Sequence, residues 1–446
     1  MSLDVSANPL LRPRVAVIGG GISGLSAAWA LSGSYDVTLF EAETRLGGHA
    51  RTVMAGRSGQ QPVDTGFIVF NYANYPHLTR LFDTLDVPVI RSDMSFGASI
   101  DEGRIEYALK DLRGLTAQRR NLLRPGFLRM VRDILAFNAR APEVAARDDL
   151  TVDELIGQMG LGQWFRDYYL LPISGAIWST PSQEIGAFPA RSLVRFFENH
   201  ALLSATGQHQ WWTVKGGSTQ YVERLLRALH LRGVDLRPKT PVTSVKRHSE
   251  GVTVSSAGML PEDFDQVVMA CHSDQAMRLL ADMDPVEHRL LSAIRYRPND
   301  MVLHCDEAAM PKRRACWSSW VYQADHRHEE AKLGVSYWMN RLQQIPESDP
   351  LFVSLNPQFA IDERKIYDSK TFYHPVFDRE AVAAQAGIAA RQGLRNTWFA
   401  GAWLRHGFHE DGIASAMRVA RGLLPLAQQS PLLPAGMGRP EIGAVA

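Results

Sequence analysis

A glycine-rich segment near the N-terminus has the residue spacing of a nucleotide-binding turn. Gly19-Gly20-Gly21-Ile22-Ser23-Gly24 follows a short apolar run over 14–18 and precedes a helix-like apolar pattern over 25–31. In a G-x-G-x-x-G turn the first glycine allows the tight bend, the second lets backbone approach a pyrophosphate, and the third lets helix and strand pack closely. Peptide N–H groups at the helix start then face the phosphates. We therefore expect cofactor contacts from Gly19, Gly21, Ile22, Ser23 and Gly24.

An acidic residue stands where a ribose would be bound. A second apolar run, 36–40, ends at Glu41, about twenty residues beyond the turn, where a carboxylate can accept both ribose hydroxyls. A carboxylate there disfavours a ribose that carries a 2′-phosphate. Glycine-rich turns alone are common, but here strand, glycines, helix, second strand and acid occur in order. The segment predicts a parallel α/β unit that binds a dinucleotide.

The residues that follow narrow the nucleotide through a family resemblance. Glu41-Ala42-Glu43-Thr44-Arg45-Leu46-Gly47-Gly48, then His49-Ala50-Arg51-Thr52, resembles the E-x-x-x-R-x-G-G extension of the flavin amine oxidase and phytoene desaturase superfamily. In that superfamily the extension runs along the FAD pyrophosphate, with the arginine near the phosphates. The resemblance implies FAD, bound non-covalently because no cysteine lies in the C-terminal region where a linkage would form. The further contacts that it implies come from Glu41, Ala42, Arg45, Gly47, Gly48, Arg51 and Thr52.

Later segments resemble the remaining pieces of the same FAD-binding domain. Residues 214–218 precede an amphipathic helix with Ser218 as its N-cap, and strands are expected over 241–245, 252–255 and 264–270. The resemblance implies that the backbone of Val242 touches the adenine end of the cofactor.

The last piece is a strand over 397–402 followed by a glycine-containing helix start over 407–416. The resemblance implies that this helix points its N-terminus at the flavin ring and the ribityl chain, where its dipole stabilises the negative charge of reduced flavin. The contacts added here are Gly401, Ala402, Asp411, Gly412, Ile413 and Ala414.

The resemblance implies an α/β protein of two domains with a monoamine oxidase-like architecture. We expect a discontinuous, Rossmann-like FAD-binding domain that comprises residues 1–77, 214–285 and 396–430. An α+β substrate domain comprises 78–213, expected to be helical, and 286–395, and residues 431–446 form a C-terminal tail.

Two aromatic and two histidine residues are the candidates for chemistry. The resemblance places Phe408 and His409 on one wall of an aromatic cage over the flavin, and Tyr373 and His374 on the other. Either histidine could remove or relay a proton near neutral pH. In the alternative, the histidines hydrogen-bond backbone or flavin edges and only shape the pocket.

One position departs from the amine oxidase pattern. Many of those enzymes carry a lysine, early in the second substrate segment, that holds a water against flavin N5. Here Asn299 or Asp300 falls at that place, and the next lysine downstream is Lys312. The departure makes an ordinary amine oxidase reaction less favoured.

The stretch from Lys110 to Arg140 is basic and amphipathic. It contains seven arginines and one lysine against Asp111 and Asp133, interleaved with leucines and aromatic residues. Such a stretch can lie on an anionic bilayer surface. It can equally be a helical hairpin whose apolar face packs inward and whose arginines are solvated. Further aromatic residues that could line an apolar channel or fill the core are Trp164, Phe165, Tyr168, Tyr169, Trp178, Trp211 and Trp212.

A closer resemblance concerns three segments, 63–71, 176–179 and 407–412. Together they are similar to bacterial predicted NAD/FAD-binding, amine oxidase-like proteins that are associated with cyclopropane-fatty-acid-synthase-type methyltransferases. The association implies a hydrophobic or lipid-linked acyl substrate and a methyltransferase partner.

Three functional hypotheses follow. The first is an FAD-dependent oxidoreductase that oxidises or desaturates a C–H bond of a fatty-acyl or phospholipid substrate. The second is an oxidase of a small amine or polyamine, which Glu410 and Asp411 keep open as cation anchors. The third is a non-catalytic, FAD-containing lipid-binding partner.

Composition and charge exclude several other classes. The 446 residues are 45% hydrophobic and 21% charged, with a net charge of +1, so no global field draws in nucleic acid. Three cysteines without paired spacing predict neither a disulfide framework nor a metal site. With no signal peptide and no long apolar run, we expect a cytoplasmic protein that can contact the inner membrane surface peripherally.

Overall fold

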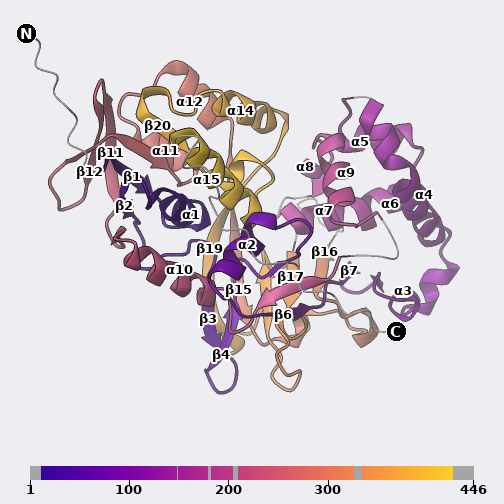
Figure 1. Cartoon of the computed structure of the whole chain (residues 1–446). Helices are drawn as coiled ribbons and strands as arrows, with labels where there is room; N and C mark the ends of the chain where they lie inside the picture. The colour runs from indigo at the N-terminus through magenta and orange to yellow at the C-terminus, as the bar shows by residue number, and fades with distance from the viewer. Residues whose placement is uncertain (1–11, 148, 179–181, 204–208, 326–333, 425–446) are drawn as a thin grey trace, which may run out of the picture.

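A five-stranded parallel sheet organises one half of the molecule (Figure 1). The computed structural model describes residues 12–147, 149–178, 182–203, 209–325 and 334–424. The strand order is β10-β2-β1-β14-β20, and every neighbouring pair is parallel. The strands are β1 (Arg14–Ile18), β2 (Asp36–Phe40), β10 (Asp235–Arg237), β14 (Gln266–Met269) and β20 (Thr397–Phe399). Strands from distant parts of the chain therefore form one sheet, and the predicted α/β class is confirmed.

Both faces of this sheet are covered, which explains why β1 and β2 are apolar along their length. Three helices lie together on one face: α1 (Ile22–Leu31), α10 (Thr219–Leu231) and α15 (His409–Leu423). On the other face pack β11 (Val242–His248), β12 (Gly251–Ser256), β13 (Glu262–Phe264), α11 (Ser273–Leu279), α12 (Pro285–Ser292) and α14 (Arg379–Ala389). Ser218 is the N-cap residue of α10, but its hydroxyl donates to Asp64 Oδ1 (2.7 Å) instead of capping the helix.

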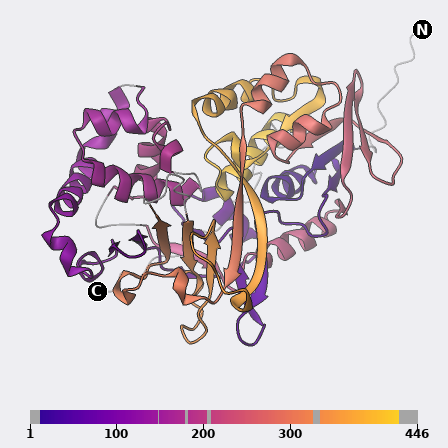
Figure 2. The same cartoon turned by 180° about the vertical axis from the view of Figure 1, so that it is seen from behind.

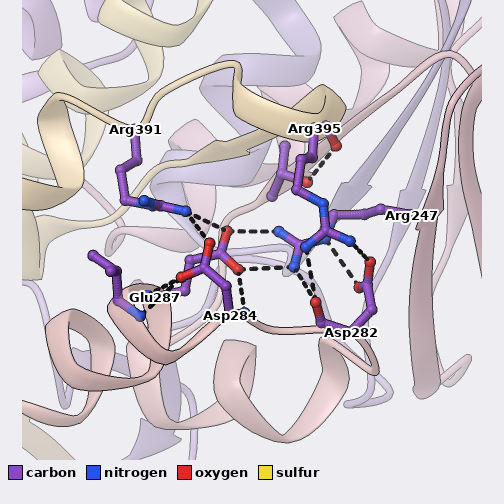
Figure 3. Close-up of polar contacts among 8 residues, drawn as sticks. Arg247, Asp282, Asp284, Glu287, Arg391 and Arg395 are labelled. Carbon is purple, nitrogen blue, oxygen red and sulfur yellow. Dashed lines mark hydrogen bonds and ion pairs between the residues drawn. The ribbon is translucent and has the colours of Figure 1, made fainter.

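A buried ion-pair network joins these outer elements (Figure 3). The Arg247 side chain on β11 is fully buried and binds both carboxylate oxygens of Glu287 on α12, at 2.6 and 2.8 Å. Its Nε also donates to Asp282 Oδ1 at 3.0 Å. Arg395 pairs with Asp282, and Arg391 with Asp284. The network ties β11 to segments that lie 35 to 148 positions further along the chain.

A seven-stranded, largely antiparallel sheet forms the second half, seen from both sides in Figures 1 and 2. Its order is β19-β15-β18-β17-β16-β7-β8, with only the β16–β7 pair parallel. The strands are β7 (Phe96–Ile100), β8 (Ile105–Ala108), β15 (Tyr296–His304), β16 (Trp320–Ala324), β17 (Gly334–Trp338), β18 (Phe352–Leu355) and β19 (Ile366–Pro375). The short helix α13 (Met339–Leu342) follows β17.

A helical lobe packs against the β7–β8 end of this sheet. It contains α3 (Leu112–Leu115), α4 (Pro125–Arg147), α5 (Val152–Gln158), α6 (Gln163–Phe165), a π-helical turn (Arg166–Leu170), α7 (Leu171–Trp178), α8 (Ser182–Ile185) and α9 (Ala190–Asn199). The expectation that 78–213 is helical was incomplete, because the segment also supplies β7, β8, β6 (Val89–Ser92) and β9 (Trp211–Val214). These strands are four or five residues long, too short to show a clear alternation in sequence.

Small elements connect the two halves. β3 (Thr52–Ala55) pairs with β4 (Gln61–Asp64), β5 (Val69–Phe70) pairs with β9, and α2 (Pro76–Thr84) packs against α15. No helix within the described residues is both long and apolar enough to cross a bilayer. The predicted domain boundaries stay a prediction.

Candidate active site

One cavity of about 1540 Å³ reaches from the glycine turn after β1 to the seven-stranded sheet and the helical lobe. Its lining includes most of the predicted cofactor residues at one end and a set of apolar side chains at the other. The predicted residues in the lining are Gly19, Gly21, Ile22, Ser23, Glu41, Ala42, Arg45, Gly48, Val242, Gly401 and Ala402, with Tyr373, His374, Phe408 and His409.

Glycine is present at Gly24 and at Gly21 for different structural reasons. A Cβ on Gly24 would lie 1.8 Å from the carbonyl oxygen of Gly19, so this glycine is required for helix–strand packing. A Cβ on Gly21 would meet nothing closer than Gly48 Cα at 3.9 Å, although Gly21 lines the cavity. The absence of a protein neighbour at Gly21 fits a residue that leaves room for a ligand, as the second glycine of a pyrophosphate cradle does.

Glu41 and Arg45 shape the backbone around this turn. Glu41 accepts hydrogen bonds from the backbone N–H of Gly20 (2.7 Å) and of Glu43 (2.8 Å), which holds its carboxylate at the end of β2. The Arg45 guanidinium donates to the carbonyl oxygens of Ala50 and Gly48. Arg45 therefore fixes the paired-glycine bend while it lines the cavity.

Several predicted cofactor residues bind protein partners outside the lining. Arg51 makes a two-point ion pair with Asp368 on β19, at 2.6 and 3.1 Å, and Thr52 donates to Asp64 (2.6 Å). Gly47 has a φ of +117°, and a Cβ there would lie 2.9 Å from the Ala50 carbonyl oxygen. For Arg51, Thr52, Gly47 and Gly24 the structure thus gives a structural role, and cofactor contact stays a prediction.

The start of α15 sits directly against the glycine turn. A Cβ on Gly412 would lie 2.8 Å from Ile22 and 2.9 Å from Ser23, so the two helices cross at this glycine. Asp411 accepts from the backbone N–H of Phe408 (3.0 Å) and of His406 (3.2 Å), and burial raises its pKa to about 6. Asp411, Gly412, Ile413 and Ala414 are not in the cavity lining among the described residues. Their arrangement brings a helix N-terminus to the cofactor end, and their contact with cofactor stays a prediction.

His409 lies inside the wall of the cavity. Its ring stacks on Phe67 at a centroid distance of 4.0 Å, and its Nε2 is 2.6 Å from the Tyr221 hydroxyl. Burial lowers the pKa of His409 to about 3. A neutral imidazole that is hydrogen-bonded to Tyr221 favours the alternative in which His409 only shapes the pocket. The catalytic role of His409 stays a prediction.

His374 belongs to a cluster of three histidines. The ring of His49 lies 5.5 Å from that of His374 and 6.3 Å from that of His272. Burial lowers the pKa of His374 to about 4 and that of His49 well below its usual range. His49 lines the cavity, and its buried Nε2 has no hydrogen-bond partner among the described residues. Sequence reasoning missed His49, although its place directly after the paired glycines was an available signal.

The two predicted aromatic walls are only partly formed. Phe408 stacks on Phe196 (5.0 Å between centroids), and the His200 ring lies 3.8 Å from that of Phe196 and 6.0 Å from that of Phe408. Tyr373 contributes to the lining, but its side chain is 53% exposed. Alternation along β19 directs Tyr373 away from the face that carries Phe372 and His374.

The far arm of the cavity is apolar and largely aromatic. Three of the residues whose role the sequence left open, Tyr169, Trp178 and Trp211, line it, whereas Phe165 is in the core. Further lining residues are Met94, Phe96, Ile173, Phe196, Trp320, Tyr337, Val353 and Leu355. The acidic residues in the described lining are Glu41, Glu43, Asp93 and Asp274, and only Asp93 belongs to this arm.

The candidate cation anchors are engaged elsewhere. Glu410 accepts from the backbone N–H of His77 and of Leu78, both at 3.0 Å, at the start of α2. Neither Glu410 nor Asp411 is in the described lining. Asn299 is fully buried, donates to the Arg297 carbonyl and accepts from Asn356, so it does not reach the cavity either. The lysines in the lining are Lys370, which is 2.7 Å from Glu43, and Lys110.

Comparison with known proteins gives one consistent fold and cofactor. The sequence model of the family described as flavin containing amine oxidoreductase matches residues 22–346, well over half of the chain. Polyamine oxidase 5 of Oryza sativa subsp. japonica is 38% identical over 104 residues, which are 23% of this chain and 20% of that protein. The similarity thus spans about a fifth of that relative's length.

Solved structures resemble the whole molecule. A fatty acid isomerase from P. acnes, described as producing CLA, superposes with a TM-score of 0.66 at 18% identity, covering 94% of this chain and 100% of its own. Wild-type putrescine oxidase bound to putrescine gives a TM-score of 0.66 at 17% identity, covering 92% of this chain and 99% of its own. At these identities the likeness shows the fold, a two-domain architecture with a discontinuous Rossmann-like domain. The open Gly21 position and the helix start at the glycine turn fit FAD at that end of the cavity.

Proposed function

The chain belongs to the flavin containing amine oxidoreductase family and is an FAD-dependent oxidoreductase, and we propose that it oxidises or desaturates a C–H bond of a fatty-acyl or phospholipid substrate. When bound, FAD supplies a two-electron acceptor that takes a hydride at N5 and passes the electrons to oxygen or another acceptor. In a desaturation the acyl chain loses that hydride and one proton, and a carbon–carbon single bond becomes double.

The apolar arm is the observation that carries this proposal. A long cavity lined by Met94, Phe96, Ile173, Val353 and Leu355 removes an acyl chain from water along its length. The same lining excludes water from the reacting carbon, which such chemistry requires. A fatty acid isomerase among the structural neighbours supports the same substrate class.

Removal of the proton from the acyl chain requires a side chain of the protein. His374 and His272 lie beside His49 in the cavity lining, and burial lowers the pKa of His374 to about 4. At this pKa the neutral imidazole is a weak base, and we propose that His374 accepts the proton of the acyl chain as the hydride leaves the neighbouring carbon. Phe408 and Phe196 then form the apolar wall that positions the chain.

Oxidation of a small amine is the second candidate, because polyamine and putrescine oxidases are among the relatives. A diamine needs carboxylates to replace its water, yet Glu410 and Asp411 bind backbone N–H groups. Asp93 is the acid of the apolar arm and also accepts from the hydroxyls of Ser95 and Ser319. The methyltransferase partner that the resemblance implies stays a prediction.

Product analysis tests the proposal. The purified holoprotein is incubated in air with phospholipids of defined acyl chains, and separately with putrescine, and products are analysed by mass spectrometry. We expect acyl products lighter by two hydrogens, or oxygenated, and no turnover of putrescine. Acyl products of unchanged mass but shifted double bonds would replace oxidation by isomerisation, and turnover of putrescine alone would contradict the proposal.

A matched pair of variants locates the substrate. Met94→Lys puts a charge into the apolar arm and is expected to slow acyl oxidation at least roughly tenfold, because burying an unpaired charge opposes an apolar ligand. Met54→Lys places the same residue on β3, where the methionine is exposed and outside the lining, and should leave the rate unchanged. Flavin content, read from absorbance, should be equal in both, and equal rates would remove the substrate from this arm.

A further inference from the structure

Exposed leucines are concentrated on one part of the helical lobe. Of the fifteen large hydrophobic side chains that are exposed among the described residues, six lie between Leu109 and Leu135. Leu112 is 78% exposed, Leu123 84% and Leu135 61%. Clustering within such a short segment distinguishes this surface from the single exposed leucines that are ordinary on proteins.

One side of this segment is buried against the protein, and its other side is exposed. On α4, Phe127, Met130 and Phe137 are buried against the other helices of the lobe. Leu128 and Leu135 are seven residues apart, so they share one face, and that face is directed away from the buried one. The inward packing that the sequence suggested is therefore present, and the exposed leucines form a second apolar stripe on the outer side.

Arginines surround these leucines. Arg113, Arg119, Arg120, Arg129 and Arg132 are exposed on the same segment. Asp111 accepts from the backbone N–H of Gly114 (2.6 Å), and buried Asp133 accepts from that of Gly162 (2.8 Å). Asp133 also pairs with Arg129 (3.5 Å) and Arg132 (3.1 Å), whereas Arg113, Arg119 and Arg120 form no ion pair among the described residues. Leucines beside these three arginines match a surface that is apolar beneath and negatively charged above, which describes an anionic bilayer.

The cavity lining leads directly into this surface. Leu109 and Lys110 line the cavity and immediately precede α3 (Leu112–Leu115). The Lys110 ammonium donates to the carbonyl oxygen of Trp317 (2.9 Å), which fixes this end of the lining. An acyl chain that leaves a bilayer beside Leu112 thus meets the cavity within three residues.

We propose that the leucine–arginine face, formed by Leu112, Arg113, Arg119, Arg120, Leu122, Leu123, Leu128, Arg129, Arg132 and Leu135, docks on an anionic phospholipid bilayer and places the cavity beside the lipid. Docking itself is independent of the chemistry, whereas delivery of an acyl chain rests on the proposed function. The leucines enter the interface of the bilayer, and the arginines bind the phosphate groups around them.

Vesicle sedimentation tests the docking. The FAD-loaded full chain is centrifuged with vesicles of phosphatidylglycerol and phosphatidylcholine, and with phosphatidylcholine alone. We expect binding only to the anionic vesicles, weakened roughly tenfold by high salt, which screens the arginines. A protein that stays in the supernatant with anionic vesicles, or that binds both kinds equally, would overturn the proposal.

Matched variants separate this face from the rest of the surface. Leu123→Ser and Arg119→Glu should each weaken binding to anionic vesicles several-fold. Leu231→Ser and Arg227→Glu change the same residue types on α10, which lies on the opposite side of the molecule in Figures 1 and 2, and should bind as the parent does. Equal binding by all four variants would contradict the assignment of the face.

Two further readouts keep the outcomes distinct. Sedimentation equilibrium of the free protein reports whether the leucines join two copies, and a dimer that Leu123→Ser dissociates would replace the bilayer as the occupant. Oxidation of acyl substrate in detergent micelles needs no docking, so Leu123→Ser should retain it. Vesicle binding without any acyl oxidation would support docking and overturn the proposed function. Acyl oxidation without vesicle binding would support the proposed function and overturn docking.

Discussion

Gly21 and Gly24 belong to one turn, but substitution should affect them differently. Gly24→Val forces a side chain against the Gly19 carbonyl, 1.8 Å from its Cβ, so the free energy of unfolding should fall by about 1–3 kcal/mol or more. Gly21→Val fills cavity space, so the protein should fold with its parent melting temperature as apoprotein but carry little flavin. Circular dichroism melting of the apoproteins and flavin absorbance measure the two effects. Full flavin content in Gly21→Val would contradict the phosphate-cradle assignment.

The burial of the histidines predicts how the rate of flavin reduction depends on pH. Burial lowers the pKa of His374 to about 4 and that of His409 to about 3, below the usual 6.5. Both rings are therefore neutral at pH 6–8, and a base of this kind loses its function only as pH falls towards 4. The rate of anaerobic flavin reduction should be flat from pH 6 to pH 8. A step between pH 6 and 7 that disappears in His374→Gln would show that the imidazole titrates at its ordinary pKa.

At the scale of elements, the buried network of Figure 3 holds the cofactor half together. Arg247→Ala leaves buried Glu287 with only the 3.9 Å contact to Arg391 as an ion pair, which should lower the free energy of unfolding by about 3 kcal/mol. Arg364→Ala breaks an ion pair with Asp362 in which the arginine is 88% exposed, and should leave the free energy of unfolding almost unchanged because water screens the pair. Denaturant unfolding measures both. Equal losses in the two variants would mean that the Arg247 network contributes no more than a surface pair.

Features formed by residues close together in the chain could be predicted from the sequence, whereas contacts between distant segments could not. The glycine turn, the acid at Glu41 and the helix at α15 are read from residues close together in the chain, and the structure has each of these elements. The partner of Arg51 lies 317 positions away at Asp368, so no local pattern could show that this arginine pairs with protein. The direction of Tyr373 depends on the register of β19 against β15, which places Tyr373 opposite Pro298. A one-residue shift in that register would turn Tyr373 to the other face.

For the whole molecule, the fold and the cofactor follow from the sequence, whereas the substrate arm does not. The arm is assembled from β7, β16, β17, β18, α7 and α9, which come from separate regions and meet only in the tertiary structure. Two of its aromatic residues, Tyr169 and Trp178, are equally compatible with a core position in the sequence. Their place in the lining needed the structure, as did the engagement of Glu410 with the start of α2.

The most direct test of the account is anaerobic mixing of the yellow holoprotein with acyl phospholipids, and separately with putrescine, while the flavin absorbance is followed. The account predicts bleaching by the acyl phospholipid and none by putrescine, because the cavity offers an apolar arm and its candidate cation anchors are bound to backbone. Bleaching by putrescine alone would contradict the central claim and make the protein an amine oxidase in activity as well as in family.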